Sequence, residues 1–517
     1  MKTLIRKVTP HTVVFFGSMS IMILELVASR IIAKYFGSSL YTWTGVIGVV
    51  LAGISLGNYI GGRLADRFKP SSVIFPLLLT SSGLVFLVLV LDLVLGSIMR
   101  DAATIVTAVM VVRSLAVIVL LFFIPSTFLG MNAPIMAKYA LELNLKVGTT
   151  VGSIYAVSSL GSILGTFLAG FVLIPSFDIR IIIFIVSLVI ASLSFLVIGR
   201  KLVTVGVMAA IVVLFLVFQT ADPDGLIGLG DDEVLYSRHS QHAHIQVKDF
   251  KTGDRVDVRT LIMNGLQHNR HDPANPDNLL YEYERIFGAI TEHYISTMRD
   301  PSSFTALTLG GGAMTFPAYM ERRWDPERNS VVEIDPRVVE LAFEYFDVPR
   351  DTEMNIVVAD ARAYVNTVRG DRTYDLIYLD AFSSFSIPYH LTTRQFAEEL
   401  DQILVPDGVI MANVIDIFSI GRFLNAYHNT LAAVFPHVRV YSGSTLPTTT
   451  RSTFVIVASR TPIIPDSIRD ARGAPVASTI SDEMLADLVE RNGRLVLTDT
   501  YAPVENLIAP VFLRAIN

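Results

Sequence analysis

The 517-residue sequence contains no cysteine. Disulfide bridges, thiolate nucleophiles and cysteine-ligated zinc or iron–sulfur centres are therefore excluded. Charged residues are also scarce: they make up 17% of the chain, against 52% for hydrophobic residues, and the mean hydropathy is +0.52. An ordinary soluble protein is less apolar than this, so part of the chain is expected to lie in a membrane.

Acidic residues are rare in the first two fifths of the chain. Residues 1–220 hold 15 Lys and Arg but 6 Asp and Glu, which gives a net charge of +9. Because the whole chain carries −6, residues 221–517 carry −15. The contrast separates a basic, apolar part from an acidic, soluble part, and the negative charge argues against nucleic acid as a partner of the soluble part.

Long apolar runs fill the basic part. A helix needs about 20 apolar residues to cross the hydrocarbon core of a bilayer. Seven segments qualify, at roughly 12–34, 40–62, 71–97, 104–135, 149–175, 179–199 and 202–219. The N-terminal run lacks the small-residue cleavage pattern of a signal peptide, so we expect a retained first helix. The sequence thus predicts a multi-pass α-helical domain over 1–220 in the cell (inner) membrane, with the lipid bilayer as its partner.

Two features of this part resemble transporters. Glu25 lies inside the first predicted span, where a carboxylate is costly and is therefore a candidate for function. A structural hydrogen bond or an ion pair with Arg113 is the alternative. The segment "GGRLADRFK" after the second span resembles the loop of major-facilitator transporters. Both features leave open a transporter whose soluble domain senses a nucleoside-like ligand.

Beyond a Gly- and Asp-containing linker, 221–233, the periodicity changes. Alternating apolar residues in "HAHIQVKDF" and "RVDVRTLIMNG" predict a β-hairpin within residues 234–300. Over 301–460 strands alternate with helices, which predicts an α/β Rossmann-like domain with a parallel sheet. Its strands are expected at 304–310, 329–334, 355–359, 374–380 and 408–414. Residues 461–517 form a C-terminal extension.

Glycines or an acid follow each of four successive predicted strands. The first strand ends in Gly310, Gly311 and Gly312, and the next three end in Glu333, Asp360 and Asp380. Because the carboxyl ends of parallel strands meet at one edge of a sheet, these residues are expected to converge on one ligand. Any one of the acids alone could instead cap a helix. The glycines lack the G-x-G-x-x-G spacing of dinucleotide-binding loops, which disfavours NAD or FAD.

Five motifs, taken in order, resemble one family. The motifs "LGGGAMT", "VVEIDPRVVELAFEYF", "VVADARAYV", "YDLIYLDAF" and "LVPDGVIMANV" resemble the successive signatures of spermidine synthases, polyamine aminopropyltransferases on a class I methyltransferase-type Rossmann fold. The resemblance covers about 234–460, and the membrane part is similar to the multi-spanning segment fused to many bacterial spermidine synthase-like proteins. It implies aminopropyl transfer from decarboxylated S-adenosylmethionine to a small-molecule amine, with release of 5′-methylthioadenosine, by a homodimer that needs no metal.

The resemblance also implies site residues. Asp380 would lie beside the attacking amine, and Tyr281 matches the tyrosine of the family's Y-x-E segment, so both are expected to be catalytic. Glu333 would bind the ribose, and Asp360 with Ala361 would bind the adenine edge. The other donor-binding residues are Gln267, Gly310, Gly311, Gly312 and Pro388. A sulfonium already makes its carbon electrophilic, so the chemistry needs positioning and a base rather than a metal.

Two carboxylates of the family pattern are missing here. Ala313 stands where the family has an Asp directly after the glycines, and Ser383 stands where it has a second Asp. Without them a desolvated ammonium group lacks partners. An enzyme that uses intact S-adenosylmethionine as co-substrate, as a methyltransferase or a lyase, is therefore the alternative.

Half of the ten histidines lie on the predicted hairpin and just after it: His239, His242, His244, His268 and His271. A metal site is one reading of this cluster, but lid or surface positions are expected instead. In the C-terminal extension, Asp499 and Glu505 could supply the acids that the site lacks.

Basic residues are unevenly distributed among the connections between the predicted spans. Ten lie at the N-terminus and the even-numbered connections and four lie at the odd-numbered ones, which places the N-terminus in the cytoplasm. With seven spans the soluble part would then lie outside, whereas S-adenosylmethionine is made and kept in the cytoplasm. We expect the soluble part to lie in the cytoplasm, because one miscounted span near 100–135 would place it there.

Overall fold

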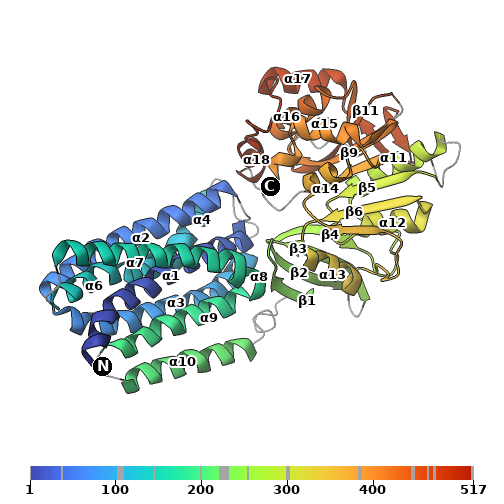
Figure 1. Ribbon diagram of the computed structural model, residues 1–517. Coiled ribbons are helices and arrows are strands. Elements are labelled where there is room, and N and C mark those ends of the chain that lie inside the picture. The colour runs from blue at the N-terminus through green and yellow to red at the C-terminus, as the bar shows by residue number, and fades with distance from the viewer. Residues whose placement is uncertain are drawn as a thin grey trace. The chain divides into compact units, whose positions relative to one another are not determined.

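The computed structural model describes residues 2–36, 39–101, 110–143, 146–197, 201–220, 232–252, 255–297, 303–381, 387–443, 449–462, 465–469 and 473–513. Ser383 and most of the predicted linker 221–233 lie outside these ranges. The chain divides into two compact units, one helical and one that holds both β-sheets (Figure 1).

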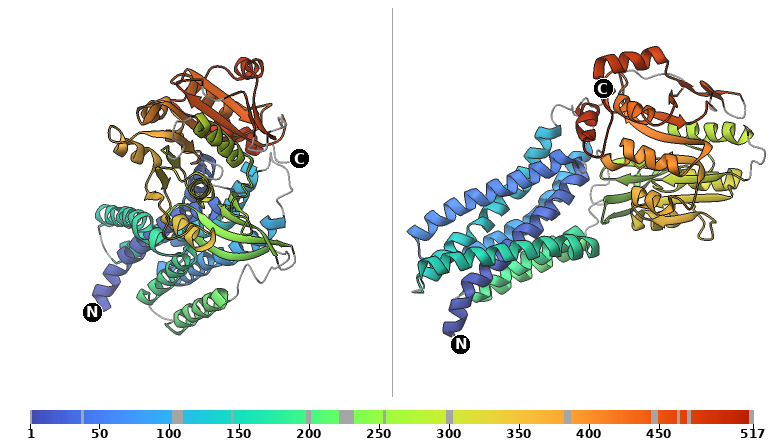
Figure 2. Two further views of the ribbon diagram at one scale, coloured as in Figure 1. Left: turned by 90° about the vertical axis from the view of Figure 1, so that its right-hand side faces the viewer. Right: turned by 45° about the horizontal axis from the view of Figure 1, so that its top comes forward.

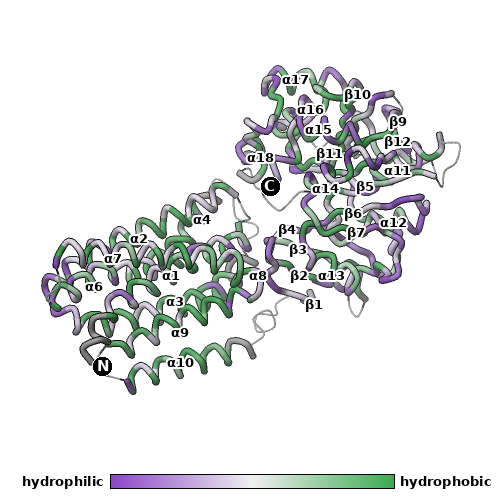
Figure 3. Tube along the Cα trace, viewed as in Figure 1, coloured by the Kyte–Doolittle hydropathy of each residue, from purple (hydrophilic) through white to green (hydrophobic). Residues whose placement is uncertain are grey.

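The helical unit consists of α1 to α10, seen from two further sides in Figure 2. Their bounds are α1 (Lys2–Phe36), α2 (Leu40–Arg67), α3 (Pro70–Asp101), α4 (Met110–Ile118), α5 (Ile124–Gly130), α6 (Asn132–Leu141), α7 (Val147–Leu168), α8 (Ile174–Ser176), α9 (Ile179–Leu193) and α10 (Lys201–Thr220). Hydrophobic residues run along most of their length (Figure 3).

Six segments of the described chain are long and apolar enough to cross a membrane: Val8–Phe36, Leu40–Arg67, Pro70–Leu95, Val112–Leu141, Val147–Ser176 and Ile179–Leu196. The seventh predicted segment corresponds to α10, whose described apolar stretch, Lys201–Val217, is shorter. The helices themselves are confirmed within the described residues, whereas seven as the number of spans stays a prediction.

Glycines bring pairs of these helices into close contact. A Cβ atom on Gly161 of α7 would lie 2.2 Å from the carbonyl oxygen of Phe15, and one on Gly165 would lie 2.5 Å from that of Met19. Both partners belong to α1, so the two glycines, four residues apart, let the backbones of α1 and α7 approach as in other small-residue helix pairs.

The larger sheet of the second unit has nine strands in the order β12-β13-β10-β11-β9-β8-β5-β6-β7. They are β5 (Thr305–Leu309), β6 (Arg328–Glu333), β7 (Asn355–Val358), β8 (Tyr374–Leu379), β9 (Leu404–Asp416), β10 (His437–Ser442), β11 (Ser452–Ser459), β12 (Ser467–Arg469) and β13 (Pro475–Thr479). β5 to β9 are parallel, and β11 runs antiparallel to both β9 and β10. This is a Rossmann-like, methyltransferase-type sheet, as predicted.

Helices cover both faces of this sheet (Figures 1 and 2). They are α11 (Glu282–Thr297), α12 (Thr315–Trp324), α13 (Pro336–Tyr345), α14 (Ala361–Val368), α15 (Arg394–Gln402), α16 (Arg422–Ala432), α17 (Asp482–Asn492) and α18 (Val504–Leu513). Side chains alternate across a strand, so Ile377 and Leu379 of β8 pack in one core, with α14 to α16. Leu376 and Tyr378 pack in the other, with α11 and α12.

The smaller sheet comprises β1 (Asp232–His239), β2 (His244–Thr252), β3 (Arg255–Met263) and β4 (Leu266–His271), in that order. The predicted hairpin is β2–β3, which pair antiparallel. The next element, α11, packs on the large sheet through Ile286 and Phe287. The segment predicted as 234–300 therefore divides its packing between its own sheet and the Rossmann-like one.

Candidate active site

The candidate site lies where the strand order reverses. β5 stands between β6, on the side of the second and third parallel strands, and β8, on the side of the fourth and fifth. Ligands of open α/β sheets bind at such a switch point, beyond the carboxyl ends of the strands. Three hydrogen bonds join the strand ends. Gly312 N donates to the side chain of Glu333 at Oε2 (2.9 Å). Two more are between backbone groups, from Ala359 N to Glu333 O at 3.1 Å and from Asp380 N to Leu309 O at 2.9 Å.

Two of the three glycines are required by the fold itself. Gly310 has φ +95°, and a Cβ atom there would lie 2.5 Å from the carbonyl oxygen of Asp380. Gly312 has φ +50°, and its Cβ would lie 2.4 Å from Oδ1 of Asn269. Side chains are disfavoured at both positions by backbone conformation as well as by space. Because glycines have no side chain, the backbone of this turn can also approach a ligand closely.

Glu333 occupies the end of β6 and is 7% exposed. Its two carboxylate oxygens accept hydrogen bonds from Gly312 N at 2.9 Å and from Asp335 N at 3.0 Å. Burial raises the pKa of Glu333 to about 7, although these two amides favour the ionised form. The carboxyl group is thus held beside the glycine turn, where a ribose bound across β5 and β6 would meet it.

Asp360 caps the N-terminus of α14, which is the alternative role given above for a single acid at a strand end. Its Oδ1 accepts a hydrogen bond from Ala363 N at 2.9 Å, and its Oδ2 pairs with His390 Nε2 at 3.0 Å. Partial burial opposes ionisation, but these hydrogen bonds outweigh it and hold the pKa of Asp360 below its usual value. His390 follows Pro388 closely, so this contact brings the predicted closing loop to the end of β7. Ala361 is buried at the first turn of α14.

Asp380 ends β8 with both oxygens engaged. Oδ2 accepts from the hydroxyl of Tyr283 at 2.8 Å, and Oδ1 accepts from Nδ2 of Asn413 at 2.8 Å. Burial raises the pKa of Asp380 to about 6 against the effect of these donors. A carboxyl group that titrates near neutral pH suits a base that takes a proton from an amine.

Tyr283 donates the tyrosine hydrogen bond to Asp380, and the catalytic role expected of the neighbouring Tyr281 stays a prediction. The two tyrosine rings stack with centroids 5.6 Å apart and an interplanar angle of 29°. Burial raises the pKa of Tyr281 to about 12, so it is a neutral phenol at physiological pH. Tyr281 therefore lies beside Tyr283, which donates to Asp380.

In β4, Asn269 contacts the glycine turn, whereas the contact of Gln267 with the donor stays a prediction. Gln267 is exposed, whereas Asn269 is buried and its Oδ1 accepts from Ala313 N at 2.8 Å. The register between β3 and β4 shifts there: Ile262 pairs with Gln267 and Leu261 with Asn269, which leaves His268 as an extra residue. This bulge breaks the two-residue alternation that a sequence reading assumes.

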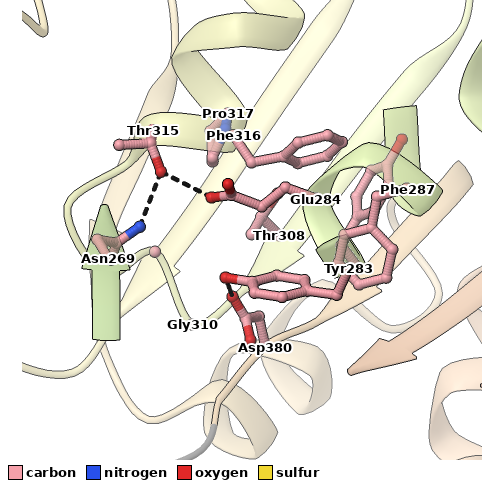
Figure 4. Close-up of a pocket in the computed structure, with 12 residues that line it drawn as sticks. Asn269, Tyr283, Glu284, Phe287, Thr308, Gly310, Thr315, Phe316, Pro317 and Asp380 are labelled. Carbon is pink, nitrogen blue, oxygen red and sulfur yellow. Dashed lines mark hydrogen bonds between the residues drawn. The ribbon is translucent and has the colours of Figure 1, made fainter. Parts of the chain in front are cut away.

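A buried polar network lies beneath the glycine turn (Figure 4). Asn269 Nδ2 donates to the hydroxyl of Thr315 at 2.7 Å, and that hydroxyl donates to Oε1 of Glu284 at 2.9 Å. Glu284 was not anticipated from the sequence, although it directly follows Tyr283 in the segment that resembles the family. Together with Asp380 these residues line a cavity of about 10 Å³.

The histidines of the smaller sheet engage other groups. His271 Nε2 lies 2.7 Å from Asp347 Oδ2, and the ring of His268 bonds the carbonyl of Leu266 at 2.9 Å. Burial lowers the pKa of His268 to about 4. In the described part of the chain no group of three or more His, Asp or Glu is arranged to hold a metal ion.

The tail acid Asp499 is paired with both terminal nitrogens of Arg362 at 2.8 Å.

Comparison with known proteins places this site in context. Residues 294–465 match the model of the spermine/spermidine synthase domain. A probable polyamine aminopropyl transferase from Bifidobacterium longum is 25% identical over 244 residues, 47% of this chain and 51% of that protein. A polyamine aminopropyltransferase from Vibrio vulnificus is 34% identical over 137 residues, 26% of this chain and 44% of that protein. The matches thus span about half the length of these relatives.

Among solved structures, a probable spermidine synthase from Corynebacterium glutamicum is 24% identical, with a TM-score of 0.43 over 52% of this chain and 95% of that one. The sheet order and the row of strand-end acids define a Rossmann-like domain of the methyltransferase type. Within it, residues 294–465 are similar to a spermine/spermidine synthase domain.

Proposed function

We propose that the protein transfers an aminopropyl group from decarboxylated S-adenosylmethionine to a small-molecule amine and releases 5′-methylthioadenosine. The observation that carries this proposal is the position of Asp380, a partly buried acid at the end of β8 that is hydrogen-bonded to Tyr283 and backed by the glycine turn. The domain match and the aminopropyltransferase relatives support the same reaction.

The donor's nucleoside would lie across the ends of β5, β6 and β7. Glu333 has the capacity to accept hydrogen bonds from ribose hydroxyls, since each carboxylate oxygen takes one protein amide and retains a further lone pair. The end of β7, with Asp360 and Ala361, would border the adenine. The loop at Pro388 would cover it, because His390 ties that loop to Asp360.

The transfer itself needs positioning and one base. The nitrogen lone pair of the amine attacks the propyl carbon bound to the sulfonium, and the carbon–sulfur bond breaks with its electron pair passing to sulfur. Sulfur leaves as a neutral thioether, and the nitrogen passes its surplus proton to Asp380 or to water. Asp380 thus keeps the nucleophile unprotonated, and binding supplies the alignment.

Ala313 favours a second candidate, an enzyme for intact S-adenosylmethionine. Ala313 is buried and bears no carboxylate, and its amide is used by Asn269. A methyltransferase would form S-adenosylhomocysteine, and a lyase would form methylthioadenosine without any acceptor.

Product analysis separates these reactions. The full chain in detergent is incubated with the decarboxylated or the intact donor, with and without putrescine, and the nucleoside product is identified by mass spectrometry. We expect methylthioadenosine from the decarboxylated donor only when an amine is present. Its absence with every amine tested would contradict the proposal.

We also propose that the helical unit crosses the cell membrane and that the enzyme domain faces the cytoplasm as a homodimer. Six spans would return the chain to the side of its N-terminus, in agreement with the loop charges and with the location of the donor. Protease added outside sealed cells should then leave the α/β unit intact.

A further inference from the structure

A buried acid, Glu284, lies with the partly buried Asp380 in the wall of the small cavity. The side chain of Glu284 is 1% exposed, and in the described part of the chain it forms no ion pair with a basic residue. Its hydrogen-bond donors are the Thr315 hydroxyl at 2.9 Å and, at the long distance of 3.4 Å, the amide of Tyr281. Buried carboxylates are normally paired, so this one retains unused acceptor capacity.

The orientation of Glu284 is fixed by a chain of donors. Ala313 N donates to Asn269 Oδ1, Asn269 Nδ2 donates to Thr315, and Thr315 donates to Glu284 Oε1. Because the Thr315 hydroxyl accepts one hydrogen bond, its proton is directed to Glu284. The network therefore leads from the backbone of Ala313, where the family's carboxylate is missing, to a carboxyl group on α11.

A third acceptor lines the same cavity without a partner. Thr308 of β5 is 3% exposed, and its hydroxyl has no hydrogen-bond partner among the described residues. The cavity of about 10 Å³ that Thr308 borders with Glu284 and Asp380 has room for roughly one water-sized group. An alkylammonium group has three N–H donors and about the size of a water molecule.

We propose that Glu284, with Asp380 and Thr308, binds an alkylammonium group of the substrate, and that Glu284 thereby replaces the carboxylate absent at Ala313. This inference rests on the proposed aminopropyl transfer and deepens it. It favours the decarboxylated donor, because the α-carboxylate of intact S-adenosylmethionine would be brought next to two acids in a cavity with no room for it. The ammonium group could belong to the donor or to the acceptor amine, which have the same chemistry.

The charge state of Glu284 supports this geometry. Burial raises the pKa of Glu284 to about 8, helped by the neighbouring Asp380. The other titratable groups that face it are Tyr281 and Tyr283 on the same segment, Tyr378 on β8, and Arg285, which favours the ionised form. At pH 7 the empty site would hold Glu284 protonated, and a bound ammonium would ionise it. Binding of the cation should therefore release a proton.

Calorimetry with three ligands tests the inference on the full chain in detergent. The ligands are decarboxylated S-adenosylmethionine, methylthioadenosine, which lacks the aminopropyl chain, and putrescine added to the methylthioadenosine complex. Glu284→Gln should weaken binding of the cation that occupies the cavity by about 10- to 100-fold, as expected for a lost hydrogen bond to a charged group. Thr308→Val should weaken it by roughly 3- to 10-fold.

Methylthioadenosine binding should change less than about twofold in both variants, which also shows that they are folded. Glu292→Gln, the same replacement on the same helix outside the cavity, serves as the matched control. A loss confined to the decarboxylated donor assigns the cavity to the donor, and a loss confined to putrescine assigns it to the acceptor. Unchanged binding of both cations to Glu284→Gln would overturn the inference. Failure of methylthioadenosine to bind the unmodified protein would instead overturn the proposed function.

Proton release is a second measurement. Titrations at pH 7 in buffers of different ionisation enthalpy should show release of more protons with the cationic ligand than with methylthioadenosine. Glu284→Gln should abolish the difference. Equal proton release from the variant would contradict the role of Glu284.

Discussion

The hydroxyl of Tyr283 donates a 2.8 Å hydrogen bond to Oδ2 of Asp380. One residue lies on α11 and the other at the end of β8, so this bond joins the helix that precedes the Rossmann-like domain to the acid proposed as its base. Hydrogen bonds to a carboxylate favour its ionised form. Burial raises the pKa of Asp380, and Tyr283, together with Asn413, lowers it.

Tyr283→Phe should move the pH dependence of the reaction. Burial raises the pKa of Asp380 to about 6, and the Tyr283 hydroxyl lowers it. Without that donor the pKa rises further, so the rising limb of kcat/KM should shift to higher pH by about one unit. Tyr281→Phe is the comparison, because it removes a neighbouring tyrosine hydroxyl while the bond from Tyr283 to Asp380 stays. An unshifted limb in Tyr283→Phe would contradict this account of Asp380.

Asp380→Asn should abolish most of the activity while leaving nucleoside binding nearly intact. The amide cannot accept a proton from the amine, and the loss of a general base costs about 100- to 10,000-fold. The change is isosteric, and Asn413 and Tyr283 can still bond the amide. Rates are compared with affinity for methylthioadenosine. Near-normal turnover would remove Asp380 from the mechanism.

Glu333→Gln should have the opposite pattern. A glutamine side chain has one acceptor oxygen where the carboxylate has two. One hydrogen bond, from the ribose or from the amide of Gly312, is therefore lost. We expect methylthioadenosine to bind about 10-fold more weakly, with a smaller effect on kcat. Affinity for adenosine without the thioether should fall in parallel, because adenosine carries the same ribose. Equal affinity of both proteins would show that the ribose lies elsewhere.

Gly312→Ala tests whether the glycine turn is required by its surroundings. The new Cβ would lie 2.4 Å from Asn269 Oδ1 in addition to the strain of φ +50°. Gly370→Ala is matched for strain alone, since Gly370 has φ +90° and nothing within 4 Å of its Cβ. A strained alanine costs roughly 1 kcal/mol, and Gly312→Ala should destabilise the protein by clearly more than Gly370→Ala. Equal melting temperatures would contradict the packing described.

Burial of two carboxyl groups predicts how stability varies with pH. The pKa of Glu284 is raised from 4.5 to about 8 and that of Glu333 from 4.5 to about 7, in both cases by burial. Between these limits the folded state keeps protons that the unfolded state releases, so this stabilisation is present below about pH 4.5 and is lost as the pH rises toward 8. Melting temperature should therefore fall from pH 5 to 8, and Glu284→Gln should make the fall shallower.

The strand-end acids could be recognised from the sequence, whereas their partners could not. Glu333, Asp360 and Asp380 each follow a short apolar run, and a parallel sheet brings such positions to one edge whatever the rest of the chain does. Tyr283 and Asp380 are 97 positions apart, and Glu284 and Thr315 are 31 apart. Those contacts depend on how α11 packs against the sheet, for which the sequence carries no local signal.

Two further features, one in β4 and one in the helical unit, could not be predicted from the sequence. The extra residue in β4 exchanges Gln267 for Asn269 at the glycine turn, and no residue type near it marks the bulge. In the helical unit the apolar runs predicted the helices well, but composition alone does not decide whether α10 crosses the membrane. Its described apolar stretch, Lys201–Val217, is shorter than the six candidate spans.

Isotope transfer tests the central claim most directly. Decarboxylated S-adenosylmethionine labelled in its aminopropyl carbons is incubated with the purified full chain and putrescine, and both products are analysed by mass spectrometry. The account predicts that the label appears in a lengthened amine, with an equal amount of unlabelled methylthioadenosine, and that Asp380→Asn forms neither. Label that stays with the nucleoside, or methylthioadenosine that forms equally without an amine, would contradict it.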